Sequence, residues 1–251
     1  MEHYALPAEV YAVGLIFSRV AAMVMLLPGI GETSVPPRIR LALAFLLSLI
    51  LYPLVRTSLP AIPAGVDGLF GQVAVEILIG LGLGAILRLF MSALAVTGEI
   101  VSLQTTLSFA QTTNPTQAEP TATLGTFLTL IGVTLVFATG LHQMFIAAMV
   151  KSFTLFAPGH APPVKEMGAL AVRMTAETFA LGVQLAAPVI VFSLVFNVAT
   201  GLVARVMPQF QVFFAATPLA LLLGLSVFAL STGLIGLVWM SRFTAFLDRL
   251  G

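Results

Sequence analysis

The sequence contains no cysteine in its 251 residues. This absence excludes disulfide bonds, thiolate metal sites and cysteine nucleophiles. Charged residues are also scarce, because Asp, Glu, Lys and Arg together make up 8% of the chain, whereas an ordinary soluble domain is about a quarter charged. So few charges cannot cover a water-facing surface. The composition therefore indicates an integral membrane protein.

Signals of catalysis and of nucleic-acid binding are missing as well. The formal net charge is +1, so the basic excess of a nucleic-acid-binding protein is absent. The histidines, His3, His142 and His160, lie far apart and none has a paired-ligand spacing on one helix. Neither a Gly-x-Ser-x-Gly elbow nor a phosphate-binding Gly-Lys-Ser/Thr loop occurs. We expect no enzymatic activity, no metal site, no cofactor and no nucleic-acid partner.

Long apolar runs make up most of the chain, which is 59% hydrophobic. The runs are residues 10–27, 41–55, 69–98, 124–150, 167–204 and 206–241. Each should be helical, because an isolated strand in lipid leaves its backbone groups unpaired. The run 124–150 predicts one clean span, whereas 206–241 is too long for one span and is punctuated by Pro208 and Pro218. The pattern predicts an all-α, polytopic membrane protein of about six hydrophobic helices, forming one domain over residues 1–251.

Charges inside these runs indicate surroundings other than plain lipid. Glu76 and Arg88 interrupt the third run, and charges at membrane depth normally face protein or water. Twelve residues, or roughly 18 Å of helix, separate them, so they cannot pair with each other. Each needs a partner elsewhere, for which another subunit is one candidate. Gly80 and Gly84 share one helix face and favour close packing, although glycine is common in membrane helices anyway.

Residues 98–123 form a semi-polar, Thr-rich segment that is closed by Asn114-Pro115. Such backbone is tolerated at membrane depth only where protein or a water-filled path surrounds it. The segment is therefore either a pore-lining or pore-closing loop, or an ordinary exposed loop between helices. Composition alone leaves both interpretations open.

Three groups of residues resemble motifs of the FliR family of flagellar biosynthetic proteins. The central group is Glu76, Gly80, Gly84, Arg88, Gly98, Glu99, Ser102, Gln104, Phe109, Ala110, Asn114 and Pro115. The upstream group is Pro28, Gly29, Pro36, Arg38 and the run 40–44. The downstream group is Met207, Pro208, Gln209, Phe210, Gln211, Val212, Phe213, Phe214, Pro218, Leu219 and Gly224. One departure is that the family's usual glycine after the central glutamine is replaced, since Thr105 follows Gln104.

The resemblance implies a non-enzymatic subunit that joins FliP-like and FliQ-like proteins in a hetero-oligomeric export gate. This gate would lie in the bacterial inner membrane at the flagellar basal body, built from bent helical hairpins around a channel for unfolded exported proteins. Other export-apparatus membrane proteins and lipid would be further partners. The family's channel plug falls by position on residues 104–117, with Gln104 at its start and Leu107 and Phe109 as apolar closure.

The resemblance also implies roles for two further sets of residues. Subunit packing or buried charge is expected of Glu76, Gly80, Gly84, Arg88 and Glu99. The C-terminal motif is carried by Pro208, Gln209, Val212, Phe213 and Pro218.

Three alternatives remain open at this point. Injectisome export proteins share the C-terminal motif, so the chain could serve an injectisome instead of a flagellum. A small secondary transporter would use Glu76, Arg88 and Glu177 to bind a solute or a proton near the midplane. A purely structural scaffold would differ from a gate only in lacking a regulated path.

Overall fold

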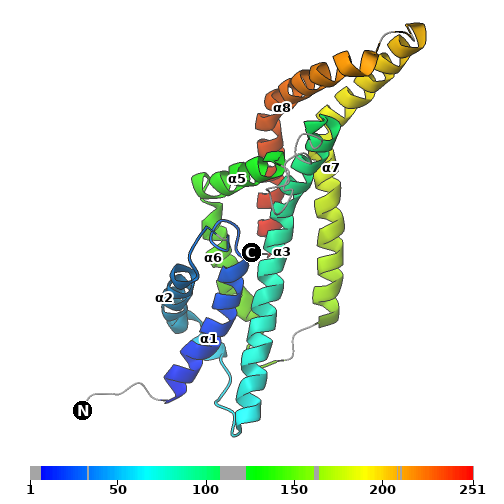
Figure 1. The fold of residues 1–251 in the computed structure, drawn as a ribbon. Coiled ribbons are helices and arrows are strands. Elements are labelled where there is room, and N and C mark those ends of the chain that lie inside the picture. The colour runs from blue at the N-terminus through cyan, green and yellow to red at the C-terminus, as the bar shows by residue number, and fades with distance from the viewer. Residues whose placement is uncertain are drawn as a thin grey trace. The chain divides into compact units, whose positions relative to one another are not determined.

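A computed structural model describes residues 7–32, 34–107, 123–160, 164–207, 209 and 211–250 of the chain. All regular elements of these residues are helical (Figure 1). They are α1 (Pro7–Leu26), α2 (Pro37–Val55) with the short 3-10 helix η1 (Arg56–Ser58), α3 (Val66–Gln104), α5 (Thr123–Ala138), α6 (Leu141–Leu155), α7 (Val164–Val206) and α8 (Val212–Leu250). The predicted all-α class is confirmed.

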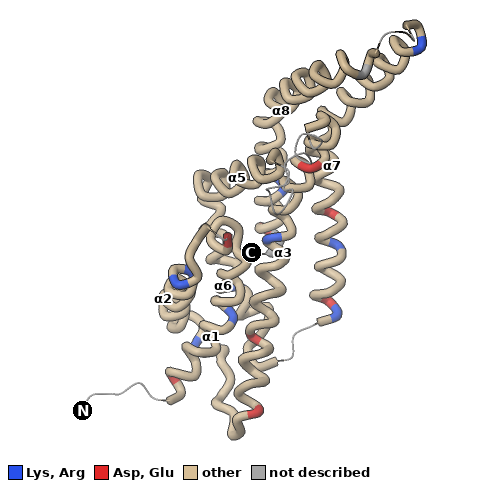
Figure 2. Tube along the Cα trace, viewed as in Figure 1, with Lys and Arg blue, Asp and Glu red and all other residues tan. Residues whose placement is uncertain are grey.

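Helix length and hydropathy support a polytopic membrane protein. Five helical stretches of the described chain are long and apolar enough to cross a membrane, namely Pro7–Leu26, Pro37–Ser58, Val66–Gln104, Val164–Val206 and Phe214–Asp248. The bent pair α5 and α6 together passes the same test and makes up to six. Figure 2 shows how sparse the charged residues are along these helices. The expected number of about six hydrophobic helices is confirmed.

The prediction of one clean span over residues 124–150 is wrong. Helix α5 ends at Ala138 and α6 begins at Leu141, and the two helices meet at an angle of 77°. Gly140 lies at the break with φ of +77°, a left-handed conformation that costs glycine little and other residues more. Because residues 124–150 contain no proline and no Asp, Glu, Lys or Arg, hydropathy gave no signal of this bend.

A break at Pro218 is also not observed, because α8 continues through this residue. Proline removes one backbone donor from a helix. In membrane proteins, neighbouring groups often satisfy the carbonyl that this leaves unpaired, so proline is tolerated within a span. Helix α7 likewise continues through Pro188. Pro188 and Pro218 therefore do not end their helices, whereas α7 ends at Val206 and α8 begins at Val212, on either side of position 208.

The chain divides into two compact units. Unit 1 comprises Met1–Phe90, Gly140–Thr175 and Phe246–Gly251, and unit 2 comprises Met91–Thr139 and Ala176–Ala245. Helices α3, α7 and α8 contribute residues to both units. The core of unit 1 is made by α1, the first part of α3, and α6, with buried side chains such as Leu15, Ile79 and Met149. The core of unit 2 contains Leu94 of α3, Leu128 of α5 and Trp239 of α8.

Candidate functional site

Unit 1 buries an ion pair between α1 and α3. The side chains of Arg19 and Glu76 are both fully buried, and Nε of Arg19 donates to Oε2 of Glu76 at 2.5 Å. A buried charge is costly unless it is paired and hydrogen-bonded. The pair therefore explains how two charges can stand inside otherwise apolar helices. Glu76 finds its partner within the same chain, so it does not need the second subunit that the sequence left as a candidate.

The guanidinium of Arg19 also binds the C-terminal end of α6. Nη1 donates to the carbonyl oxygen of Ser152 at 2.8 Å, and Nη2 donates to the carbonyl oxygen of Phe156 at 2.9 Å. These carbonyls belong to the last turn and the C-cap of the helix, where a cation interacts favourably with the helix dipole. The ring of Phe153 covers the charge, with its centroid 4.2 Å from Cζ.

Glu76 connects this cluster to the turn that follows α6. Its Oε1 accepts a hydrogen bond from the backbone N–H of Gly159 at 3.4 Å. Gly159 has φ of +81°, and an added Cβ there would lie 2.9 Å from Cγ of Pro60. Arg19, Glu76 and their partners thus join α1, α3, α6 and the turn after α6. We call these joined groups the Arg19 cluster: Arg19, Glu76, Ser152, Phe153, Phe156 and Gly159.

Close contact between α1 and α3 makes this cluster sterically possible. A Cβ at Gly80 would lie 2.3 Å from the carbonyl oxygen of Arg19, and one at Gly84 would lie 2.9 Å from Cβ of Leu26. Contacts advance in the same direction along both helices, so α1 and α3 run parallel. Glycines four residues apart allow such a backbone approach. The predicted close packing at Gly80 and Gly84 is made by α1 of the same chain.

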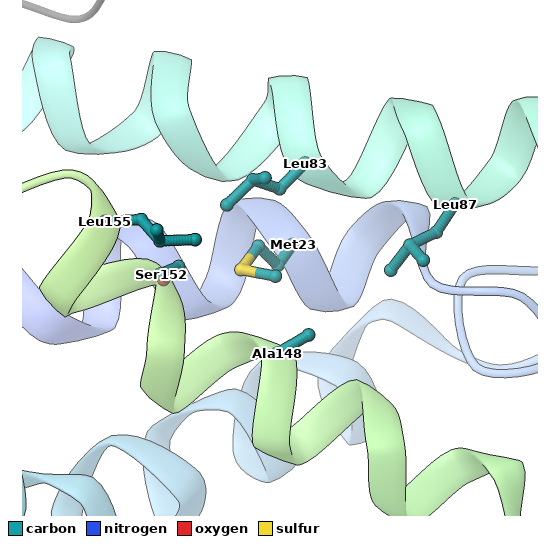
Figure 3. Close-up of a pocket in the computed structure, with 6 residues that line it drawn as sticks. All are labelled: Met23, Leu83, Leu87, Ala148, Ser152 and Leu155. Carbon is teal, nitrogen blue, oxygen red and sulfur yellow. The ribbon is translucent and has the colours of Figure 1, made fainter. Parts of the chain in front are cut away.

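A small apolar cavity adjoins the Arg19 cluster. It has an empty volume of about 320 Å³ and is lined by Met23, Leu83, Leu87, Ala148, Ser152 and Leu155. Figure 3 shows the side chains of Met23, Leu83 and Leu155 pointing toward one another between α1, α3 and α6. Such a lining offers few polar partners to a ligand or a water molecule. We therefore assign no chemistry to this cavity.

Two other predicted charges do not join this cluster. Arg88 and Glu99 are both exposed on this chain. Their expected contact with other subunits stays a prediction. Sequence reasoning missed Arg19 as the partner of Glu76, although Arg19 is the only charge within the first apolar run. The two residues are 57 positions apart, and no local spacing connects them.

Unit 2 holds a polar contact at the end of α3, at the start of the predicted plug. Oε1 of Gln104 accepts a hydrogen bond from Oγ of Ser193 at 2.7 Å, and Nδ2 of Asn197 donates to the same Oγ at 3.3 Å. Ser193 and Asn197 lie one turn apart on α7. The last side chain of α3 is therefore fixed to α7.

Thr105, which follows Gln104, is also held against a neighbouring helix. Thr105 is fully buried, and its Cγ2 would lie 2.6 Å from a Cβ placed at Gly224 of α8. Thr106 has φ of +61°, which is unfavourable for a β-branched residue and favours glycine. The strained position is Thr106 and not Thr105, which directly follows Gln104.

A second close contact in unit 2 joins α3 to α5. A Cβ at Gly98 would lie 2.2 Å from the backbone nitrogen of Gly125. Gly182 of α7 lies against the same part of α3, and its carbonyl oxygen accepts a hydrogen bond from Thr97 at 3.2 Å. The end of α3 is thus in contact with both α5 and α7 just before the predicted plug.

The remaining predicted site residues are placed as follows. Leu107 is half-buried, whereas Phe109 and the rest of residues 108–122 lie outside the described residues. In the C-terminal motif, Val212 is buried at the start of α8, while Gln209 and Pro218 are exposed. Pro208 and the side chain of Phe213 lie outside the described part. Among the described residues, no three His, Asp or Glu side chains are grouped so that they could hold a metal ion.

These observations define a polytopic helical membrane protein whose described polar clusters join helices to one another. The sequence profile of the bacterial export proteins, family 1, matches residues 10–246. The chain is 55% identical to flagellar biosynthetic protein FliR of Caulobacter vibrioides over 99% of both chains. It is 30% identical to FliR of Aquifex aeolicus over 95% of this chain and 93% of that protein. It is 32% identical to FliR of Escherichia coli over 84% of this chain and 80% of that protein. The chain therefore belongs to the FliR family of bacterial export proteins.

Proposed function

We propose that the chain is a non-enzymatic subunit of a flagellar protein export gate. In this proposal it assembles with FliP-like and FliQ-like proteins in the bacterial inner membrane, at the flagellar basal body. Together they form the channel through which unfolded flagellar proteins leave the cell. The observation that carries the proposal is the full-length likeness to a flagellar FliR protein, at 55% identity over 99% of both chains.

The surfaces of α7 and α8 support a role within an assembly. In the most apolar 18-residue stretch of each helix, only 33% of the residues of α7 and 28% of those of α8 are buried within the chain. Large apolar side chains such as Leu202, Phe214 and Leu230 are 60%, 79% and 87% exposed. Apolar surface of this extent is covered in a folded membrane protein by lipid or by other subunits. Both coverings are compatible with a gate subunit.

The attachment of Gln104 and Thr105 supports a plug in residues 104–117. A loop that closes a channel needs a fixed root, because otherwise its position in the lumen is undefined. Gln104 is held by Ser193, and Thr105 is buried against Gly224. Leu107 follows as the first apolar residue after the attachment. We infer that residues from Leu107 onward, including Phe109, occlude the channel and exclude water.

Secretion of flagellar proteins tests the proposal. Deletion of the gene in the source bacterium should abolish the appearance of flagellar subunits in the culture medium, and expression of the chain should restore it. Secretion that persists without the chain would contradict the export role.

The plug is tested by the ion permeability of the membrane. Because Thr105 contributes to packing, the deletion should begin after Leu107 and remove residues 108–113. The shortened chain should assemble normally and leak ions, whereas the full chain expressed at the same level should not. Unchanged conductance in a normally assembled complex would contradict the plug.

Two of the alternatives receive less support. Within the Arg19 cluster, Glu76 is fully buried and accepts hydrogen bonds from two other segments, α1 and the turn after α6, which is the pattern of a structural pair and not of an open solute site. The relatives are named flagellar biosynthetic proteins, which favours the flagellum over an injectisome. A structural scaffold without a regulated path differs from the gate only in the outcome of the permeability experiment.

A further inference from the structure

Within unit 1, helix α3 has one exposed stripe of regularly spaced residues. Positions 71, 74, 78, 81, 85 and 88 are all exposed, and the steps between them alternate between three and four residues. Side chains at this spacing lie above one another on one face of a helix. The stripe covers roughly 26 Å of helix. We call this face the α3 stripe: Gly71, Ala74, Leu78, Leu81, Ala85 and Arg88.

Other faces of α3 are covered by helices of the same chain. Gly80 lies against the backbone of α1, and a Cβ at Gly82 would overlap the side chain of Met167 in α7. Leu87 lines the apolar cavity between α1, α3 and α6 (Figure 3). In the α3 stripe, by contrast, a Cβ at Gly71 would meet nothing within 4 Å. The described part of unit 1 therefore leaves this face of α3 open.

The pattern of the α3 stripe is that of a surface on which another helix packs. Alternating steps of three and four residues are the heptad pattern by which the side chains of two helices interdigitate along their length. Three of the six residues are glycine or alanine, and small residues let a neighbouring backbone approach closely. Leu78 and Leu81 are 54% and 39% exposed and supply the apolar contact. The α3 stripe is thus suited to a helix as its neighbour.

Arg88 places a positive charge in this apolar face. It is the only charged residue between Glu76 and Glu99, and roughly 16 Å of helix or more separates it from either one. Glu76 is already paired with Arg19. Within the described part of the chain, Arg88 forms no ion pair. Its guanidinium therefore requires a counter-charge from outside these residues.

Three other coverings fit the α3 stripe less well than a helix with a carboxylate. Lipid tails suit Leu78 and Leu81 but are a costly surrounding for the guanidinium of Arg88, and headgroups lie at the ends of an apolar run and not near its middle. Water solvates the charge but leaves the apolar surface uncovered. A second copy paired along the same stripe brings no counter-charge, because the stripe contains no carboxylate.

We propose that the α3 stripe packs against an apolar helix of another subunit, and that an Asp or Glu of this helix forms an ion pair with Arg88. The planar guanidinium offers a carboxylate two parallel hydrogen bonds, which fixes the register of the two helices. The glycine and the two alanines bring the backbones close enough for this pair. The proposal rests on the proposed function in one respect, namely that the chain assembles with other membrane subunits.

Charge reversal at position 88 tests the ion pair. The tagged chain is expressed with its genomic neighbours and extracted in mild detergent, and the accompanying proteins are quantified by mass spectrometry. Arg88→Glu should lower the recovery of at least one subunit roughly tenfold or more, because two carboxylates then face each other. The variant purified alone should keep the thermal midpoint of the wild type, since Arg88 is exposed on this chain. The control is Lys165→Glu, an exposed position in the first turn of α7, which should leave recovery unchanged.

A compensating replacement identifies the partner. In the Arg88→Glu background, changing one Asp or Glu of the lost subunit to Lys or Arg should restore its recovery to the level of the wild type, because the pair is re-formed with its charges exchanged. The same replacement opposite wild-type Arg88 should lower recovery. Wild-type recovery in Arg88→Glu would overturn the proposal. So would restoration only by changes within this chain.

Photo-cross-linking in whole membranes separates this proposal from the export-gate proposal. A photoreactive residue at position 85 should cross-link to a polypeptide other than this chain. Cross-linking to lipid or to a second copy, or no cross-link, would overturn the α3 stripe as an interface even where FliP-like and FliQ-like proteins co-purify with the chain. A cross-link to a membrane protein unrelated to export would contradict the export gate and support the α3 stripe.

Discussion

Loss of the Glu76 charge should destabilise unit 1 strongly. In Glu76→Gln the side chain keeps its shape and one acceptor oxygen, but Arg19 remains charged and fully buried. Breaking a buried ion pair by removing one partner costs roughly 3–5 kcal/mol, which is a large part of the roughly 5–15 kcal/mol that stabilises a typical folded protein. We therefore expect low yields of monodisperse protein, and a free energy of unfolding lower by several kcal/mol.

A double-mutant cycle separates the ion pair from the other contacts of the cluster. Arg19→Met alone should also cost roughly 3–5 kcal/mol, because Glu76 then keeps only the hydrogen bond from Gly159. The double variant Arg19→Met, Glu76→Leu removes both charges and leaves the carbonyl of Phe156 without its donor and the N–H of Gly159 without its acceptor, a cost of about 1–3 kcal/mol for the first and less for the long contact of the second. The coupling energy of the cycle should thus be about 3 kcal/mol or more.

The assay is titration of the purified chain, in mild detergent, with a denaturing detergent, followed by circular dichroism. Arg19→Lys serves as a further variant, because an ammonium cannot reproduce the three-way fork of Nε, Nη1 and Nη2. A Glu76→Gln variant that loses less than about 1 kcal/mol would refute the assignment of a stabilising buried pair, since surface pairs are worth that little. Additive single and double variants would refute it as well.

Three further variants test the helix contacts. Gly80→Ala should lower the thermal midpoint of unfolding by the equivalent of about 1–3 kcal/mol, because the new methyl group overlaps the backbone of α1. Its control is Gly71→Ala on the same helix, where the methyl group meets nothing within 4 Å. This control should be neutral or slightly stabilising. Gly98→Ala should cost at least as much, since its methyl would meet the backbone of α5, and Gly233→Ala in open space is its control. Ser193→Ala should cost about 1–2 kcal/mol and should speed hydrogen exchange at the end of α3, because the hydrogen bonds of its hydroxyl with Gln104 and Asn197 are both lost. An equal response of each variant and its control, or unchanged exchange in Ser193→Ala, would contradict these contacts.

Composition and periodicity were sufficient for the class of the fold. Few charges and long apolar runs predicted membrane helices, and the structure contains such helices. Their ends differ from the predicted ends by several residues: the run 69–98 corresponds to α3, which begins at Val66 and ends at Gln104. The 77° break near Gly140 was not predicted, because a single glycine in an apolar run is common within membrane helices. The break expected at Pro218 is absent because a helix can lose one donor and continue.

The candidate sites depended more on tertiary contacts. Glu76 was found from its position in an apolar run, but its partner Arg19 is 57 residues away and follows from the packing of α1 on α3. Gly80 and Gly84 predicted a close neighbour without identifying α1. Gln104 was found by resemblance alone, and its hydrogen bond to Ser193 of α7 required the structure. Spacing along one helix can identify a shared face, whereas it carries no information on which distant helix covers that face.

Co-purification tests the central claim most directly. The chain is tagged, expressed together with its genomic neighbours, extracted in a mild detergent and purified, and the accompanying proteins are identified by mass spectrometry. The proposed export gate predicts recovery of FliP-like and FliQ-like proteins in constant ratios with the wild-type chain. Recovery of the chain alone, or only as a homo-oligomer, would contradict the gate and return the chain to the transporter alternative.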